Sequence, residues 1–280
     1  MINRKNETIR SLLRAPGNIL SYIFITIVAF FSLFPFIWMV MGATNSTEDL
    51  VAGSFKFGTK LGENFETLTS TINLPRVLGT TFQIAILGTL ASLLVASLAG
   101  YGFEIFRSRI REGIYKTLLL LMMVPFISLL VPLFLLAAKL KMLNSVITVI
   151  LPLVASIYTI FFFRQSAKAF PRELLEAARL DGLGEFGIFF RIFMPTMKST
   201  YAAAAINLFM IYWNNFLWTL VVMQSENMKT MNLALSSFVY AYVPDYGLLT
   251  LASIITTLPM VLVFFVMQRQ FVEGMLGSVK

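Results

Sequence analysis

Long apolar stretches, rich in Leu, Ile, Val and Phe, alternate with short polar segments along the 280-residue chain. Six of these stretches are long enough to cross the hydrocarbon core of a bilayer as a helix, which takes about 20 apolar residues. They cover residues 17–42, 77–103, 117–138, 142–163, 199–223 and 246–268. None of the six contains Asp, Glu, Lys or Arg. The pattern therefore predicts an all-α membrane protein with six transmembrane helices and no strand meander.

Five prolines lie inside these predicted spans, namely Pro35, Pro125, Pro132, Pro152 and Pro259. A proline removes one backbone hydrogen bond from a helix, but neighbouring helices in a bundle can satisfy the carbonyl group that it frees. We therefore expect kinks rather than helix ends at these positions.

The distribution of Lys and Arg indicates how the chain is oriented. If both termini face the cytoplasm, 16 of the 22 basic residues fall in inner segments and 6 in outer segments, the direction of bias that membrane proteins show. We predict cytoplasmic termini, a cytoplasmic tail at residues 1–16, one transmembrane domain at 17–280, and polar outer loops at 43–75 and 224–245. The first apolar run is longer than the 7–15 residues usual in a signal peptide, which predicts a retained anchor.

Composition narrows the chemistry that the chain can perform. Hydrophobic residues make up 58% of it and charged residues 13%, whereas soluble domains carry about 25% charged residues. There is no cysteine and no histidine, which removes disulfides, Cys/His metal sites and imidazole acid–base chemistry. The phosphate-binding pattern G-x-x-x-x-G-K-[ST] is also missing. We predict no enzymatic activity, no cofactor, no metal site and, because membrane orientation accounts for the +8 charge, no nucleic-acid partner.

The uncharged spans also bear on the source of energy and on the cargo. Ion-driven transporters usually keep ionisable groups near the membrane midplane, and the predicted spans hold none. Direct coupling to protons or sodium is therefore disfavoured, although backbone carbonyl groups can hold sodium. Energy would then arrive through a partner, and a neutral, hydroxyl-rich cargo is favoured over an ion.

Residues 171–195 interrupt the apolar pattern between the fourth and fifth predicted spans. Pro171 suits the first position of a helix, and Gly182 suits its C-terminal stop. A second short helix follows, whose 3.6-residue period places four phenylalanines on one face: Phe186, Phe189, Phe190 and Phe193. We predict a helix–turn–helix elbow on the cytoplasmic side. An ordinary inner loop whose Phe-rich half lies on the membrane remains an alternative.

The first helix of this elbow offers a surface to a partner. Ala177 and Ala178 keep the helix slim enough for a partner's backbone to approach closely. Leu174 and Leu175 provide apolar contacts, and Glu176 offers a carboxylate to a partner's hydrogen-bond donors.

The elbow also resembles a known signature. The letters EAA at residues 176–178, followed by Gly182, Ile192 and Pro195, resemble the EAA motif of ABC-importer permeases, which reads EAA, three residues, G, nine residues, I, one residue, L, P. The sequence departs from the motif only at Met194, where the family has Leu. This conservative exchange leaves the resemblance intact.

Other segments extend the resemblance over most of the chain. GTTFQIAILGTLASLLVASLAGYGF, residues 79–103, is similar to the second-span region of the carbohydrate-uptake subfamily. WNNFLW, residues 213–218, resembles the fifth-span motif, although Thr219 stands where a proline commonly follows. The final ten residues, FVEGMLGSVK, resemble the end of the smaller permease of the maltose-type importer.

This resemblance implies a type I ABC importer permease fold with both termini cytoplasmic and a cytoplasmic coupling elbow between spans four and five. The chain would form half of a translocation pore in a bacterial-type cell membrane, surrounded by lipid. Its partners would be a second homologous permease subunit, two ATPase subunits that hydrolyse ATP, and an extracytoplasmic sugar-binding protein. ATPase coupling is implied for seven residues and a further contact for the tail 270–280; the seven are Glu176, Ala177, Ala178, Gly182, Leu174, Leu175 and Arg179.

The fifth predicted span holds the candidate substrate path. Amide groups suit hydroxyl groups and aromatic rings suit the apolar faces of a sugar, so the candidates are Tyr212, Asn214, Asn215 and Trp218. Asn207, Ile211, Asn214 and Trp218 share one helical stripe. As alternatives, such amides often bond to a neighbouring helix, and Trp and Tyr often form an interfacial belt.

The outer loop after this span is the candidate contact for the binding protein, through Gln224, Ser225, Glu226 and Asn227. Methionines flank it at positions 223, 228 and 231 and suit an adaptable surface, or loose packing on the membrane.

Three hypotheses follow. The leading one is the permease subunit of an ATP-driven, binding-protein-dependent importer of a neutral carbohydrate. The second is a self-sufficient secondary carrier or channel for a neutral solute, and the third is a membrane scaffold or signalling protein. Sugars from mono- to oligosaccharides, polyols and glycerophosphodiester-like compounds all fit the subfamily.

Overall fold

The computed structural model describes residues 16–239 and 244–276, and every regular element in this part of the chain is a helix. The prediction of an all-α protein is therefore confirmed. The α-helices are α2 (Pro16–Gly42), α3 (Thr47–Val51), α4 (Leu61–Thr71), α5 (Leu74–Ile105), α6 (Arg109–Leu121), α7 (Phe126–Lys139), α8 (Val146–Val154), α9 (Ile157–Ala167), α10 (Arg172–Leu180), α11 (Glu185–Ile188), α12 (Met194–Thr196), α13 (Lys198–Trp213), α14 (Leu217–Val222), α15 (Met231–Val239) and α16 (Tyr246–Leu276). A π-helix, η1, covers Phe189–Phe193, and a 3₁₀-helix, η2, covers Glu226–Met228.

Three helices in the described part are long and apolar enough to cross a membrane: α2 from Ile19, α5, and α16 up to Gln268. Two helix pairs pass the same test together, α6 with α7 and α8 with α9, although they bend by 101° and 47°. The described residues thus hold three to five candidate spans, so the count of six and the cytoplasmic termini stay predictions. Residues 1–15 of the predicted tail lie outside the described residues, as do the side chains at 270–280.

Pro125 corrects one expectation about the prolines. α6 ends at Leu121, and Pro125 caps the N-terminus of α7 with an extended ψ of 132°. A proline disfavours helical geometry in the residue before it and donates no backbone hydrogen bond, and here these effects end the helix outright instead of kinking it. The other four prolines lie inside α2, α7, α8 and α16.

The fifth predicted span, 199–223, is not one helix. α13 ends at Trp213 and α14 begins at Leu217, which leaves residues 214–216 as a break. Asn214 closes α13 through its backbone N–H, which donates to the carbonyl groups of Met210 and Tyr212. Asparagine is a poor helix former because its side chain competes for backbone groups, so two in a row explain where the helix stops.

Several helices run beyond the apolar stretches that predicted them. α5 includes Glu104, and α9 includes Arg164, one residue past the predicted ends of those spans. Both side chains are buried, with 4% of each residue exposed. The predicted spans themselves hold no charge, but α5 and α9 continue past them and carry these two charges at their ends. The apolar pattern placed both residues in loops because each predicted span ends at the first charged residue. A helix can continue past a charged residue.

The described residues divide into two compact units, one within Met1–Ser70 and Phe238–Ile255, the other within Thr71–Ser237 and Thr256–Lys280. In the first unit, the predicted outer loop at 43–75 contains α3 and α4. Asn64 on α4 is buried and donates to the carbonyl groups of Ala43 at 2.9 Å and Asn45 at 3.1 Å. These bonds tie α4 to the segment after α2.

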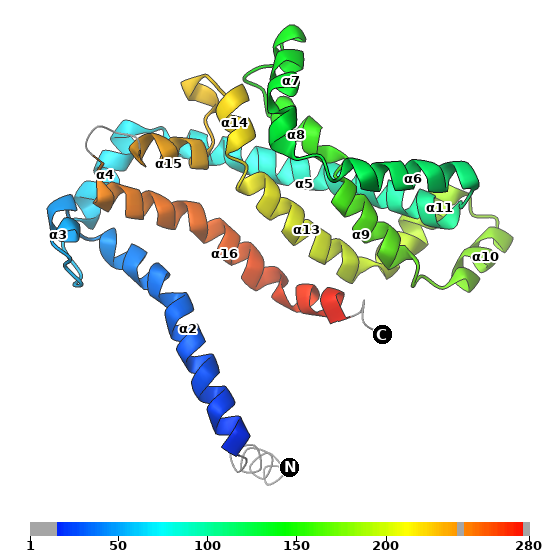
Figure 1. Ribbon diagram of the computed structural model, residues 1–280, viewed down its shortest axis with the longest axis horizontal. Coiled ribbons are helices and arrows are strands. Elements are labelled where there is room, and N and C mark those ends of the chain that lie inside the picture. The colour runs from blue at the N-terminus through cyan, green and yellow to red at the C-terminus, as the bar shows by residue number, and fades with distance from the viewer. Residues whose placement is uncertain (1–15, 240–243, 277–280) are drawn as a thin grey trace. The chain divides into compact units, whose positions relative to one another are not determined.

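The second unit is built on α5, α9 and α13, which lie side by side (Figure 1). Glycines on α5 permit this close approach. A Cβ atom on Gly88 would lie 2.6 Å from the ring of Tyr212 on α13, and one on Gly100 would lie 2.7 Å from the Cβ of Phe163 on α9. Ser92 and Ala96, between the two glycines, are fully buried. One face of α5 therefore serves as the packing platform of this unit.

Candidate functional site

The segment 171–195 folds as a helix and a turn followed by further short helices. Gly182 takes the left-handed conformation, with φ of +80°, directly after α10. The backbone N–H of Leu183 donates to the carbonyl of Ala178 at 3.0 Å, and that of Gly182 donates to the carbonyl of Arg179 at 3.1 Å. This pair of bonds is the Schellman motif, which satisfies the last carbonyl groups of a helix. The predicted helix stop at Gly182 is confirmed.

One side of α10 is fixed to the rest of the second unit. Leu175 is 3% exposed and Ala178 is 2% exposed. The other buried members of this elbow cluster are Tyr101, Ala167, Phe170, Ile188, Phe189 and Phe193. Leu175 and Ala178 therefore hold the helix on its own subunit. Burying this much apolar surface makes the elbow a fixed projection of the fold, since each large side chain contributes about 1.5–3 kcal/mol.

The opposite side of α10 is exposed. It carries four of the predicted coupling residues, Leu174, Glu176, Ala177 and Arg179. Glu176 has no hydrogen bond or ion pair to any other described residue, although its charge lies near Arg179. A carboxylate next to small and apolar side chains, presented on a rigid helix, is what a docking partner can use.

The second half of the elbow differs from the expected regular helix. Phe189 and Phe193 are buried and stack with their ring centroids 5.6 Å apart, but Phe186 and Phe190 are exposed. The prediction that all four rings share one face is wrong. The cause is the π-helix η1, whose wider turn does not keep the 3.6-residue period.

An ion pair closes the turn between α10 and α11. Nε of Arg179 donates to Oε1 of Glu185 at 2.9 Å, and Oη of Tyr101 on α5 donates to Oε2 of the same carboxylate at 3.1 Å. The hydrogen bond and the negative charge of Glu185 raise the pKa of the Arg179 guanidinium. Sequence reasoning did not single out Glu185 or Tyr101, because the contact spans 84 residues.

Tyr212 and Trp218 are buried to 2% and 1% exposure, and their polar atoms are engaged inside the fold. Oη of Tyr212 lies 2.8 Å from Oγ of Ser92 and donates to the carbonyl of Ile150 at 3.3 Å. Nε1 of Trp218 donates to the carbonyl of Thr148 at 2.8 Å. In this structure both rings therefore pack α13 and α14 against α5 and α8.

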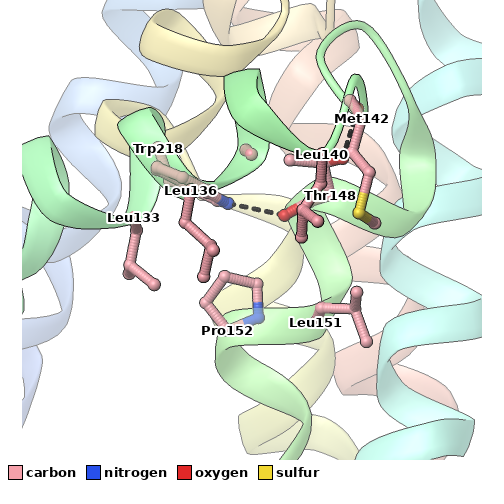
Figure 2. A pocket seen from close by; sticks show the side chains of 9 residues that line it. Leu133, Leu136, Leu140, Met142, Thr148, Leu151, Pro152 and Trp218 are labelled. Atoms are coloured by element: carbon pink, nitrogen blue, oxygen red, sulfur yellow. Dashed lines mark hydrogen bonds between the residues drawn. The ribbon is translucent and has the colours of Figure 1, made fainter.

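Figure 2 shows the bond from Trp218 to Thr148 at one wall of an apolar cavity of about 250 Å³ between α7, α8 and α14. Its other lining residues include Leu133, Leu136 and Pro152. Almost all of this lining is hydrocarbon, which suits an apolar neighbour and offers a sugar few hydrogen bonds.

The two asparagines at the break are less buried than the rings of Tyr212 and Trp218. Asn214 is exposed and Asn215 is half-buried, and neither side chain makes a hydrogen bond to the described residues. The break itself is held by Asn232, whose Nδ2 donates to the carbonyl of Trp213 at 2.7 Å. Asn207 and Ile211 are also exposed, so three members of the predicted stripe share an open face and Trp218 does not.

The candidate contact for a binding protein begins at a short structured turn. Gln224, Glu226 and Asn227 are exposed, while the backbone N–H of Ser225 donates to Oδ1 of Asn144 at 2.8 Å. Of the flanking methionines, Met223 and Met231 are 1% and 0% exposed. Both are buried in the core, so neither an adaptable surface nor loose packing on the membrane describes these two positions.

Comparison with known proteins fits this helical fold. Residues 88–277 match the family described as the binding-protein-dependent transport system inner membrane component. The chain belongs to this family. It is therefore a multi-pass inner membrane component of a bacterial transport system. The matched residues include the whole elbow, α13 and α14.

Two relatives of the chain are named as permease proteins of transport systems. The chain is 50% identical over 270 residues to the lactose transport system permease protein LacG of Rhizobium radiobacter, covering 96% of this chain and 99% of that protein. It is 40% identical over 203 residues to the arabinooligosaccharides transport system permease protein AraQ of Bacillus subtilis (strain 168), covering 71% and 72%.

A solved bacterial ABC transporter involved in the import of the acidic polysaccharide alginate has a chain of the same fold. Its TM-score is 0.79 at 17% identity, and the match covers 91% of this chain and 96% of that one. The expected ABC importer permease fold is therefore confirmed.

Proposed function

We propose that the chain is one of two permease subunits that together form the pore of an ATP-driven importer for a neutral oligosaccharide. A second homologous permease completes the pore, two ATPase subunits supply energy, and an extracytoplasmic sugar-binding protein delivers the cargo. Residues 17–280 act as one permease domain with the elbow on the cytoplasmic side. The observation that carries the proposal is the elbow, in which one side of α10 is buried and the other is open to a partner.

Docking on an ATPase uses the exposed side of α10. Leu174, Glu176, Ala177 and Arg179 contact the ATPase, while Leu175 and Ala178 anchor the helix and Gly182 fixes its end. A rigid projection transmits displacement because packed cores do not deform continuously.

A neutral sugar is favoured by two observations. The relative with 50% identity is named for lactose and the one with 40% for arabinooligosaccharides, whereas a relative from Rhizobium meliloti named for sn-glycerol-3-phosphate has 28%. The open amides at the break, Asn214 and Asn215, can donate to and accept from hydroxyl groups without adding charge. They line the path of the sugar, and Gln224, Glu226 and Asn227 face the binding protein.

The test is reconstitution of the assembled importer in proteoliposomes with labelled lactose as the probe. Glu176→Arg reverses the charge at the proposed interface, and we expect it to abolish lactose uptake and the stimulation of ATP hydrolysis by the loaded binding protein. Glu66→Arg, the same change on an exposed position of α4, is the matched control and should leave both unchanged. Normal coupling in Glu176→Arg would overturn the proposal. Uptake by this chain alone without ATP would support the secondary carrier instead.

A further inference from the structure

A buried arginine lies where α9 meets α5 and α6. Nη2 of Arg164 lies 2.6 Å from Oε2 of Glu112, and Nε lies 3.4 Å from Oε2 of Glu104. The guanidinium carbon also lies 3.8 Å from the ring centroid of Tyr115, a cation–π contact. The Arg164 and Glu104 side chains are 5% and 4% exposed. We call these four residues the arginine cluster.

Stability alone does not explain this cluster. Burying charges removes them from water, and apolar side chains of similar volume often hold a core together as well or better. The cluster is also incompletely satisfied, because Nη1 of Arg164 and Oη of Tyr115 have no hydrogen-bond partner in the described part of the chain. What such a group supplies well is a fixed relative position of three helices, since its directional bonds favour one arrangement.

The arginine cluster and the elbow cluster use consecutive turns of the same two helices. On α5, Tyr101 packs in the elbow cluster and Glu104 lies three residues later. On α9, Arg164 is followed three residues later by Ala167, which also packs in the elbow cluster. Tyr101 further donates to Glu185, the carboxylate that Arg179 of the elbow holds. Polar contacts and core packing thus run from the exposed side of α10 to α5, α9 and α6.

We propose that Arg164 is the positioning residue that joins the elbow, α5, α9 and α6 into one body, so that displacement of the elbow by the ATPase moves these helices together. Glu112 fixes α6 to this body and Glu104 fixes α5. The inference rests on the proposed coupling function of the elbow. It assigns to these three charged side chains a role in transmission that is separate from docking.

The absence of native cysteines allows a direct test by spin labelling. Labels at Phe186→Cys on the elbow and Ile114→Cys on α6 use two exposed positions, 74% and 50% exposed. Double electron–electron resonance would measure the distance between them in the assembled importer, nucleotide-free and trapped with ATP and vanadate. We expect one unchanged distance distribution in the two states, and in Arg164→Met a distribution that shifts and broadens on trapping. Arg191→Met, an exposed arginine of the elbow, is the matched control and should behave like the parent.

Two further variants separate transmission from folding. Glu112→Gln keeps the shape of the side chain and removes one charge, and we expect a smaller shift of the same kind. Arg164→Lys keeps a positive charge beside both carboxylates and should retain the parent distribution in part. An unchanged distribution in both Arg164→Met and Glu112→Gln would overturn the inference.

A cross-linking experiment distinguishes failure of the inference about Arg164 from failure of the proposed function. A photoreactive label at Phe186→Cys should cross-link to the ATPase in the parent and in Arg164→Met alike, because the variant retains docking. No cross-link in the parent would refute the proposed coupling function and the inference with it. Cross-linking in both proteins together with unchanged distances would refute only the role of Arg164.

Discussion

The elbow at 171–195 and the break at 214–216 both interrupt helical structure in the second unit, but their side chains are distributed differently. In the elbow, the predicted coupling residues on α10 divide into two buried anchors, Leu175 and Ala178, and an exposed set. Around the break, the two tryptophans of the motif are buried and hydrogen-bonded, whereas Asn214 is exposed and Asn215 is half-buried. Each segment therefore mixes buried residues that hold the fold with exposed residues that are open to a partner or a ligand.

Physical differences between the two regions explain this contrast. The proposed docking surface projects from the fold, and buried residues next to it in sequence, such as Leu175 and Phe193, form its apolar base. A break inside a predicted membrane span frees backbone groups that must be satisfied within the protein. The carbonyl of Trp213 at the break is satisfied by Asn232. Trp218 does the same for the carbonyl of Thr148 in α8, because Pro152, four residues later, has no N–H to donate. Substitutions at these positions separate residues that support the fold from residues that contact a partner or the sugar.

Phe193→Ala should have the largest effect. The side chain is fully buried against the rings of Tyr101, Phe170 and Phe189, and removing such a ring costs about 3–5 kcal/mol. Thermal unfolding of the purified importer would measure this loss, and ATP hydrolysis should become insensitive to the binding protein. Phe186→Ala, at the exposed ring of the same elbow, is the control and should unfold like the parent. Equal stability of the two variants would contradict the division into base and surface.

Trp218→Phe should lower the free energy of unfolding without changing affinity for sugar. It keeps most of the ring but leaves the carbonyl of Thr148 without its donor, which costs about 1–3 kcal/mol for a buried group. Denaturant unfolding and the KM for lactose uptake would be measured together. A large rise in KM with unchanged stability would place Trp218 in the sugar path instead.

Gly182→Ala should cost about 1–2 kcal/mol, because a residue with a Cβ atom is strained in the left-handed conformation. The loss should appear in unfolding of the assembly and in weaker cross-linking of the elbow to the ATPase. Gly113→Ala, in the middle of α6 with open space around it, is the matched control and should not destabilise the protein. An effect of equal sign and size at both positions would argue against the role of the turn.

Asn214→Ala should have the smallest effect on stability and a clear effect on transport. The side chain is exposed and unbonded within the described residues, so the free energy of unfolding should change by less than about 0.5 kcal/mol. Loss of one hydrogen bond to a sugar should raise the KM for lactose about 2- to 10-fold. An unchanged KM would remove Asn214 from the sugar path.

Local signals in the sequence predicted much of the elbow. Gly182 marks the helix stop because few other residues take its backbone conformation, and the EAA spacing marks the segment within the family. The period of the phenylalanines led to a wrong prediction, because residues Phe189–Phe193 form a π-helix, in which Phe193 packs against Tyr101 and Phe170. The two asparagines after Trp213 are a local sign of the break. The hydrogen bond from Asn232 that holds the break has no such sign in the sequence.

By itself, the sequence determined that this is an all-helical membrane protein of the permease family, because apolar length and motif spacing are local properties. Only the tertiary structure decided that α6 and α7 meet at a sharp bend, which side chains of the elbow are open, and that Arg164 joins α5, α6 and α9. The bonds of Arg164 join residues 52 and 60 positions apart, and the buried side of the elbow packs with Tyr101 of α5. A pattern read along one helix carries no information about such partners, since burial and pairing are set by the neighbouring helices.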